Sequence, residues 1–139
     1  MLVALLTDFG LTDTYVGVMK AIIADLAPGV ALVDLTHAVP PQDVAAGAWH
    51  LAVAAPYLPA EAVVLAVVDP GVGTARRPVA VQLGPRIFVA PDNGLLTRVL
   101  AQTAPPRAVA LDNPAWWLQS TPSATFHGRD IFAPVAGRL

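Results

Sequence analysis

The sequence predicts an α/β domain with a central, largely parallel β-sheet and helices on both faces. Short, continuously apolar runs alternate along the chain with longer segments in which apolar residues recur at helical spacing. The apolar runs lack the polar alternation of a strand with one solvated face, which is typical of parallel strands covered on both sides. Glycine, proline and aspartate separate the runs, so each run is expected to form an element of its own.

The predicted strands are rich in Val, Leu, Ile and Ala between turn residues, and they span residues 2–7, 30–35, 62–69, 78–83, 86–90 and 107–111. The two strands that flank Gly84-Pro85 are close enough in sequence to form a hairpin. The predicted helices have apolar positions three and four residues apart, and they span residues 14–26, 45–55, 95–102 and 129–139.

Turn and capping residues justify the boundaries of the helices. Pro28-Gly29 ends the first helix, whose apolar side is expected to include Tyr15, and Asp43 caps the second helix. The sequence PDNG opens the short third helix, and Pro134 is expected to bend or shorten the last one. Residues 112–125 are expected to form a long irregular connector.

Composition narrows the classes of protein to which the chain can belong. Its 139 residues predict one domain, with 55% hydrophobic and 13% charged residues. The formal net charge of −2 gives no reason to expect a nucleic-acid partner. No apolar run approaches the roughly 18 residues of a membrane span, and the apolar start lacks a basic leader. We therefore expect a cytoplasmic protein without a membrane partner, and the absence of cysteine excludes disulfides and thiolate metal sites.

Polar residues gather where four of the predicted strands end. The sequences TDFGLTD, DLTH, DPGVGTARR and APDNG follow the first, second, third and fifth strands, respectively. In open α/β sheets, ligands bind beyond the carboxyl ends of the strands. The sequence therefore predicts a ligand site at this edge of the sheet.

Asp8 follows the first strand directly and precedes Phe-Gly. Dinucleotide-binding folds use an acid near a strand end to receive the hydroxyls of a ribose, which is one interpretation of Asp8. The other interpretation is a turn-forming aspartate that accepts hydrogen bonds from local backbone amides. The spacing alone does not choose between the two.

Asp69 ends the third strand, and Arg76 follows after a loop that contains Gly71 and Gly73. The glycines allow a sharp turn and a close approach of the backbone to a ligand. The loop is long enough to return the guanidinium to the carboxylate, where it would keep Asp69 ionised. A structural ion pair that closes the loop is the alternative. A phosphate nest has weak support, because the Lys-Ser/Thr of a Walker motif is missing.

His127 stands just before the last predicted helix, with Asp130 in its first turn. The positive end of a helix favours the neutral imidazole, which can accept a proton. A capping or loop histidine is the alternative. His50 is interpreted as a packing residue, and His37 as a residue behind the site. No spacing such as HxH or HxxxH indicates a metal site, so none is expected.

Five blocks of the chain, taken in order, resemble one family: TDFGLTDTYVGVMKAII, DLTHAVPPQDVAAGA, VVDPGVGTARRP, APDNGLLT and TFHGRDIFAPVAGRL. They are similar to the S-adenosyl-L-methionine hydrolases, also called SAM hydroxide adenosyltransferases, which are relatives of the fluorinase and chlorinase. The resemblance runs from residue 3 to the last residue. It implies an N-terminal domain with a central sheet, in which water attacks the ribose C5′ of S-adenosylmethionine and releases adenosine and methionine without a cofactor.

The resemblance also implies the roles of individual residues. In the family an Asp, an Arg and a His hold and activate the water, and they match Asp69, Arg76 and His127. The acid that holds the ribose hydroxyls matches Asp8. The residues that match the pocket wall near C5′ are Pro70, Gly71, Phe126 and Gly128.

Departures within the family refine this expectation. The halogenases have Tyr where Asp69 stands, and a carboxylate there would repel a halide, so Asp69 favours water as the nucleophile. Family members continue into a C-terminal β-rich domain, and they form trimers whose site lies between two subunits. We expect residues 1–139 to be the N-terminal catalytic domain without that second domain, and to be weakly active or inactive alone. A non-catalytic nucleoside-binding module, a structural partner domain and a metal-dependent hydrolase are the alternatives.

Overall fold

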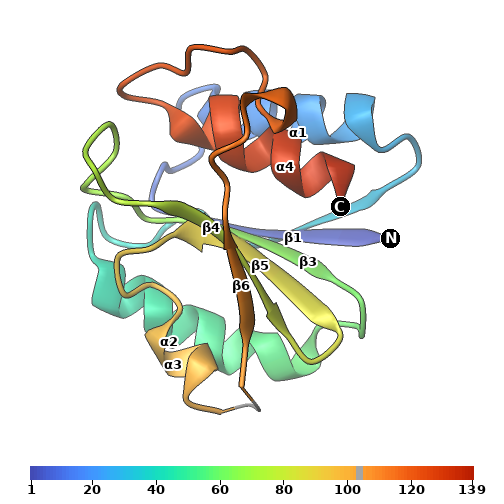
Figure 1. Cartoon of the computed structure of the whole chain (residues 1–139). Coiled ribbons are helices and arrows are strands. Elements are labelled where there is room, and N and C mark those ends of the chain that lie inside the picture. The colour runs from blue at the N-terminus through green and yellow to red at the C-terminus, as the bar shows by residue number, and fades with distance from the viewer. Residues whose placement is uncertain (103–104) are drawn as a thin grey trace.

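Six strands form one sheet in the computed structural model, which describes residues 1–102 and 105–139 (Figure 1). The strands are β1 (Leu2–Thr7), β2 (Ala31–Thr36), β3 (Val63–Val67), β4 (Pro78–Leu83), β5 (Arg86–Pro91) and β6 (Arg107–Ala110). Their order across the sheet is β2-β1-β3-β5-β4-β6. The pairs β1–β2, β1–β3 and β3–β5 are parallel, whereas β4 runs antiparallel to both β5 and β6. The predicted, largely parallel sheet is confirmed, as is the hairpin of β4 and β5.

Helices cover both faces of the sheet. The helices are α1 (Tyr15–Leu26), α2 (Val44–Ala54), α3 (Thr97–Leu100) and α4 (Ala133–Arg138). Helices α1 and α4 pack together on one face, and α2 and α3 pack together on the other (Figure 1). Among the described residues, no helix combines the length and the apolar character needed to cross a membrane.

The hydrophobic core has two layers, because successive strand residues point to opposite faces of the sheet. In β3, Val63 and Leu65 belong to the layer beneath α1 and α4, whereas Val64 and Ala66 belong to the layer beneath α2. Every residue of β3 is buried, as expected for a central strand covered on both sides. The continuous apolar run therefore follows from the position of the strand in the middle of the sheet.

The first two helices begin and end near the predicted residues. In α1 the buried positions are Val16, Met19 and Ile23, which recur at helical spacing. Tyr15 was expected on this apolar side, but it is 48% exposed at the start of the helix, where its ring contacts Phe9 and Phe126. Asp43 caps α2, as predicted, and its carboxylate accepts a hydrogen bond of 2.9 Å from Ala46 N.

The third helix is shorter than the predicted segment 95–102. Tertiary contacts hold residues 93–96 in a turn: the side chain of Asn93 donates to Val68 O and accepts from Leu95 N. Gly94 has a φ of 96°, and Thr97 N donates to its carbonyl. The turn thus replaces the first helical turn, and only the segment from Thr97 onward is α-helical.

The closing helix, predicted over 129–139, consists of a π-helical turn, Gly128–Phe132, followed by α4. Ala133 N donates to Gly128 O, five residues earlier. Pro134 has no N–H for the carbonyl of Asp130, and Leu118 N donates to that oxygen instead, at 2.8 Å. Pro134 therefore accompanies a change in helix type and frees a carbonyl that holds the preceding connector, which itself contains the 3₁₀ turn Pro114–Trp116.

The strand order places a topological switch point between β1 and β3. The chain adds β2 on one side of β1 and then β3 on the other side, and these strands are parallel. Their carboxyl ends therefore lie at one edge of the sheet, and Asp8 and Asp69 follow β1 and β3 there. Ligands of open α/β sheets bind at such switch points.

Candidate active site

Three predicted residues meet beyond the end of β3. The guanidinium of Arg76 donates through Nε to both carboxylate oxygens of Asp69, at 2.9 and 3.0 Å, and through Nη2 to Oδ2. The same Nη2 lies 2.8 Å from Nδ1 of His127. Arg76 thus joins an acid from a strand end to a histidine 51 positions further along the chain.

The ion pair is shielded from solvent. The side chains of Arg76 and Asp69 are 8% and 4% exposed, respectively. The ring of Phe132 lies under the guanidinium, with 5.5 Å from Cζ to the ring centroid. Within the described part of the chain, Nη1 of Arg76 is buried without a hydrogen-bond partner. A buried donor without a partner is costly, so this atom is suited to a polar ligand atom or a water.

The geometry determines which nitrogen of His127 carries the proton. A guanidinium can only donate, so Nδ1 of the neutral ring accepts from Arg76 and Nε2 is protonated. Burial lowers the pKa of His127 below its ordinary value, and the positive charge of Arg76 lowers it further. The imidazole is therefore neutral near pH 7.

Close packing fixes the loop between Asp69 and Arg76. Gly73 has a φ of 77°, and a Cβ there would lie 2.2 Å from the carbonyl oxygen of Ala124. Only glycine fits this contact, which seats the loop on the segment that precedes His127. The hydroxyl of Thr74 donates to Gly71 O and stabilises the turn formed by residues 71–74. Contacts in two distant parts of the chain thus bring Arg76 to His127.

Asp130 anchors the other side of the site. Its side chain is fully buried and accepts hydrogen bonds from Ser123 N at 2.7 Å and from Arg129 Nε at 2.6 Å. Burial alone would raise the pKa of Asp130, but the hydrogen bonds from Arg129 and Ser123 hold it below its ordinary value. The carboxylate therefore stays charged and holds the connector against the π-helical turn that begins after His127.

Phe126 and Gly128, two of the predicted pocket residues, lie in an aromatic cluster. The ring centroids of Phe126 and Tyr15 are 5.0 Å apart, and those of Phe126 and Phe9 are 5.8 Å apart. A Cβ at Gly128 would lie 3.0 Å from Cε2 of Phe126 and 3.2 Å from the sulfur of Met19. Gly128 therefore allows the ring of Phe126 to pack closely against the backbone directly after His127.

The other three predicted residues lie at the same edge of the sheet. Pro70 is exposed and Gly71 is half-buried, directly after Asp69. Asp8 stands at the end of the neighbouring strand, and its Oδ2 accepts a hydrogen bond of 2.6 Å from Gln42 N. Gln42 is 34 positions from Asp8, so this is not the local bond of a turn-forming aspartate, and it involves only Oδ2 of the carboxylate.

Gln42 and His37 have contacts here that the sequence did not predict. Gln42 is a non-glycine residue with a φ of 65°, a conformation that is uncommon and costs about 1 kcal/mol or more. In the sequence, only its position after two prolines points to an unusual backbone conformation. His37 is 4% exposed and bonded on both ring nitrogens, consistent with its interpretation as a residue behind the site. Within residues 1–102 and 105–139, no three His, Asp or Glu side chains are grouped to hold a metal ion.

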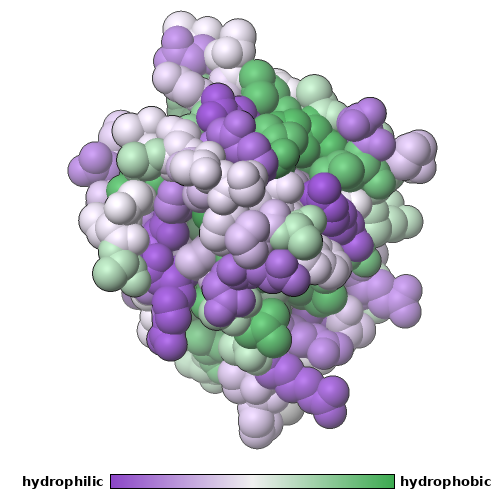
Figure 2. All heavy atoms as spheres, turned by 45° about the horizontal axis from the view of Figure 1, so that its top comes forward, coloured by the Kyte–Doolittle hydropathy of each residue, from purple (hydrophilic) through white to green (hydrophobic). Residues whose placement is uncertain are grey.

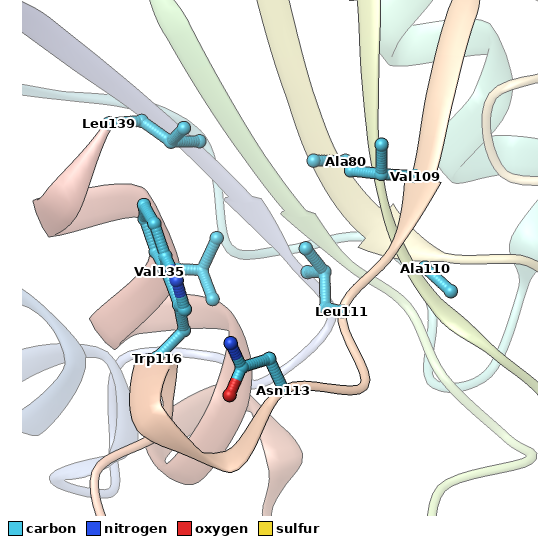
Figure 3. A pocket seen from close by; sticks show the side chains of 8 residues that line it. All are labelled: Ala80, Val109, Ala110, Leu111, Asn113, Trp116, Val135 and Leu139. Carbon is cyan, nitrogen blue, oxygen red and sulfur yellow. The ribbon is translucent and has the colours of Figure 1, made fainter.

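A hollow lies away from this cluster, between β6, the connector and α4 (Figure 3). Its lining is apolar except for Asn113, whose side chain accepts from Ala115 N. The lining residues are Ala80, Val109, Ala110, Leu111, Asn113, Trp116, Val135 and Leu139. The hollow has no acid or base, so it lacks the groups for chemistry. The surface on the α1 and α4 side mixes apolar and hydrophilic residues (Figure 2).

The fold and the site together define an α/β domain with an Asp–Arg–His cluster at a switch point, in which the Asp–Arg pair is buried and the histidine is half-buried. The chain belongs to the family of the SAM hydroxide adenosyltransferase N-terminal domain, whose model matches residues 3–139. This finding agrees with the resemblance seen in the sequence blocks.

Similar proteins cover the chain almost completely. A Thermus thermophilus protein named (R)-S-adenosyl-L-methionine hydrolase is 54% identical over 142 residues, which cover 96% of this chain and 54% of that protein. A Salinispora tropica protein of the same name is also 54% identical, covering 96% of this chain and 51% of the relative. The crystal structure of an uncharacterized conserved protein from Thermotoga maritima is 42% identical with a TM-score of 0.94, covering 97% of this chain and 52% of that one. The chain thus spans about half the length of the proteins that it matches.

Proposed function

We propose that the chain is the catalytic, N-terminal half of an S-adenosyl-L-methionine hydrolase. Water attacks the ribose C5′, and the products are adenosine and L-methionine. The observation that supports this reaction best is the position of Arg76, which is bonded to Asp69 and His127 and has one buried donor, Nη1, without a partner in the described part of the chain. The names of the relatives from Thermus and Salinispora support the same reaction.

Each group in the cluster has a role in this reaction. Departure of methionine breaks the C5′–S bond, and its electron pair neutralises the sulfonium, so the leaving group needs no acid. The difficult step is to align a water opposite sulfur and remove its proton. Arg76 Nη1 would hold the water and stabilise the developing hydroxide, which electrostatic preorganisation makes effective in a buried site. Asp69 keeps the guanidinium in place.

His127 is the proton acceptor in this proposal. The neutral ring has its lone pair on Nδ1, and a positioned base contributes roughly 10²–10⁴ in rate. Arg76 Nη2 occupies that lone pair, so the water must displace this contact before it can transfer its proton. The proton then leaves to solvent through the half-exposed ring, and the reaction balances as water plus sulfonium giving adenosine, methionine and a proton.

Asp8 is the proposed ribose-binding acid, because it follows the strand next to β3 and keeps one carboxylate oxygen free of the bond to Gln42. Pro70, Gly71, Phe126 and Gly128 form the proposed wall near C5′. The reaction requires no metal or organic cofactor. A cytoplasmic homotrimer, in which a C-terminal domain of a neighbouring subunit completes the pocket, is the proposed assembly.

The test uses the 139-residue chain and S-adenosylmethionine in water enriched in oxygen-18. The expected product is adenosine with the heavy isotope at the 5′-hydroxyl, detected by mass spectrometry, and its formation should stop in Asp69→Asn. Binding of adenosine without any product from S-adenosylmethionine, in an assay that would detect a rate well below the roughly hundredfold reduction expected for an incomplete pocket, would instead indicate a nucleoside-binding module. Product formed equally by the wild type and Asp69→Asn would remove the cluster from the mechanism.

A further inference from the structure

A second hydrogen-bonded network, buried at Thr7 and His37 and exposed at Asp34, lies next to the proposed ribose-binding acid. Thr7, which ends β1, is fully buried, and its hydroxyl lies 2.8 Å from Nδ1 of His37. The other ring nitrogen, Nε2, lies 2.9 Å from Oδ1 of Asp34. Oδ2 of Asp34 accepts from the ammonium of Lys20 at 2.6 Å. Neither Thr7 nor Asp34 takes part in the proposed reaction, yet Thr7 immediately precedes Asp8.

The chemistry of Asp34 determines which groups donate to it in this network. Burial would raise the pKa of Asp34, but the bonds from Lys20 and His37 hold it below its ordinary value, so it is an acceptor only. Nε2 of His37 must therefore carry a proton, and Nδ1 shares a hydrogen bond with the Thr7 hydroxyl. That hydroxyl oxygen accepts in turn from Phe9 N, at 3.2 Å. The four side chains and the amide of Phe9 thus form one continuous hydrogen-bonded network.

The backbone of His37 holds the same loop from the other side. Its carbonyl accepts a hydrogen bond of 2.8 Å from Gly10 N. The segment that follows His37 also provides Gln42 N, the donor to the Asp8 carboxylate. Residues 8–10 are therefore fixed through Thr7, Phe9 and Gly10 to a single histidine, and Asp8 lies within this clamped segment.

We propose that His37 is a positioning residue for the ribose-binding acid: through Thr7 and its own carbonyl it holds the 8–10 loop so that the Asp8 carboxylate faces the ligand. This role rests on the proposed function of Asp8. Any buried histidine needs partners for its ring nitrogens, so those bonds alone do not indicate the role. The distinguishing observation is that the ring, through Thr7, and the carbonyl, through Gly10, both bond to the segment that carries Asp8.

The first test is Thr7→Val, which keeps the shape of the side chain and removes the hydroxyl. Thr36→Val is the matched control, because the Thr36 hydroxyl also accepts from the amide two residues later, Ala38 N, at 3.1 Å and at a neighbouring strand end. The affinity of the chain for adenosine is compared with its affinity for adenine. We expect Thr7→Val to weaken adenosine binding by about tenfold or more, to leave adenine binding unchanged, and to be non-additive with Asp8→Asn. Thr36→Val should bind both ligands as the wild type does.

The second test needs no ligand. The amide proton of Gln42 is bonded to Asp8 Oδ2, so its NMR chemical shift reports the place of the carboxylate. It should move upfield in Thr7→Val and in His37→Gln, and stay in place in Thr36→Val. An unchanged Gln42 amide in Thr7→Val, or an additive double mutant with Asp8→Asn, would overturn the positioning role. If the Gln42 amide moves as expected but the wild type binds no adenosine, the proposed function fails while the positioning of Asp8 by His37 stands.

Discussion

Arg76 Nη2 lies 2.8 Å from Nδ1 of His127, and the two residues are 51 positions apart in the sequence. Gly73 supports this contact because its approach to Ala124 excludes any Cβ, whereas a Cβ at Gly128 would only crowd the ring of Phe126, at 3.0 Å. A bond from a guanidinium to Nδ1 also sets the tautomer of the ring. The packing of the loops thus determines both the place and the chemical form of the proposed base.

The first prediction concerns the stability of the ion pair. Arg76→Met leaves the carboxylate of Asp69 buried without its partner, and such a loss costs about 3–5 kcal/mol of unfolding free energy. Arg77→Met is the matched control, because Arg77 pairs with Asp92 on the surface and its side chain is 72% exposed. The control should change stability by less than about 1 kcal/mol. Urea unfolding of both variants measures the difference. Equal losses of unfolding free energy would show that the buried Asp69–Arg76 pair stabilises the fold no more than the exposed Arg77–Asp92 pair.

The second prediction concerns Gly73. Gly73→Ala combines an unfavourable φ of 77° with a contact of 2.2 Å to a carbonyl oxygen, so the loop must move away from Ala124. Gly84→Ala is the matched control, since Gly84 has a φ of 58° but open space around it. The control should cost about 1–2 kcal/mol from the backbone alone. Thermal unfolding should show a clearly larger loss for Gly73→Ala, and similar losses would contradict the close packing described for the site.

The third prediction concerns pH. The pKa of His127 is lowered by burial and by Arg76, so below about pH 6.5 the unfolded chain binds a proton that the folded chain resists. The unfolded state then binds more protons, and the contribution of His127 to stability falls as the pH drops from about 6.5 to its lowered pKa. NMR titration of the imidazole Cε1–H gives this pKa directly. A His127 pKa at or above its ordinary value would contradict the assignment.

The fourth prediction separates the base from a simple hydrogen-bond acceptor. His127→Asn keeps an acceptor near Nδ1 but cannot take a proton near pH 7. If His127 is the base, adenosine formation should fall by roughly 10²–10⁴, with adenosine binding nearly unchanged. His50→Asn, a change to the half-buried histidine of α2, is the control and should keep full activity. Retained activity in His127→Asn would leave Arg76 alone as the group that activates water.

The fifth prediction concerns the part of the pocket that this chain provides. The matched relatives are about twice as long, since this chain covers 54% of the Thermus protein and 51% of the Salinispora protein. If their remaining half supplies much of the substrate pocket, the 139-residue chain should release adenosine at least roughly hundredfold more slowly, because positioning is incomplete. Adenosine release by the chain and by the Thermus hydrolase is compared at equal concentration. Comparable turnover would contradict the need for a second half.

Much of the fold could be predicted from the sequence, because buried parallel strands can be recognised as continuous apolar runs. The position of the candidate site could also be predicted, because polar residues that follow the parallel strands β1 and β3 must share one edge of the sheet. The π-helical turn could not, because it depends on Pro134 and on a hydrogen bond from Leu118, far outside the helix. The shortening of α3 likewise depends on a tertiary bond from Asn93 to Val68.

The roles of His37 and Gln42 were the least accessible to sequence reasoning. The spacing between Thr7 and His37 gives no sign that the two side chains meet, since parallel strands bring them together only after β1 and β2 pair. The φ of Gln42 leaves no trace in composition, because glutamine is not a residue that favours this conformation. Both residues contact the loop of Asp8 through bonds that only the folded chain makes.

A crystal structure of the chain soaked with adenosine tests the central claim most directly. The account predicts ribose hydroxyls within hydrogen-bonding range of Asp8, and the 5′-oxygen within that range of Nη1 of Arg76, beside His127. Adenosine seated in the apolar hollow near Trp116, or bound with its 5′-oxygen remote from Arg76, would contradict it.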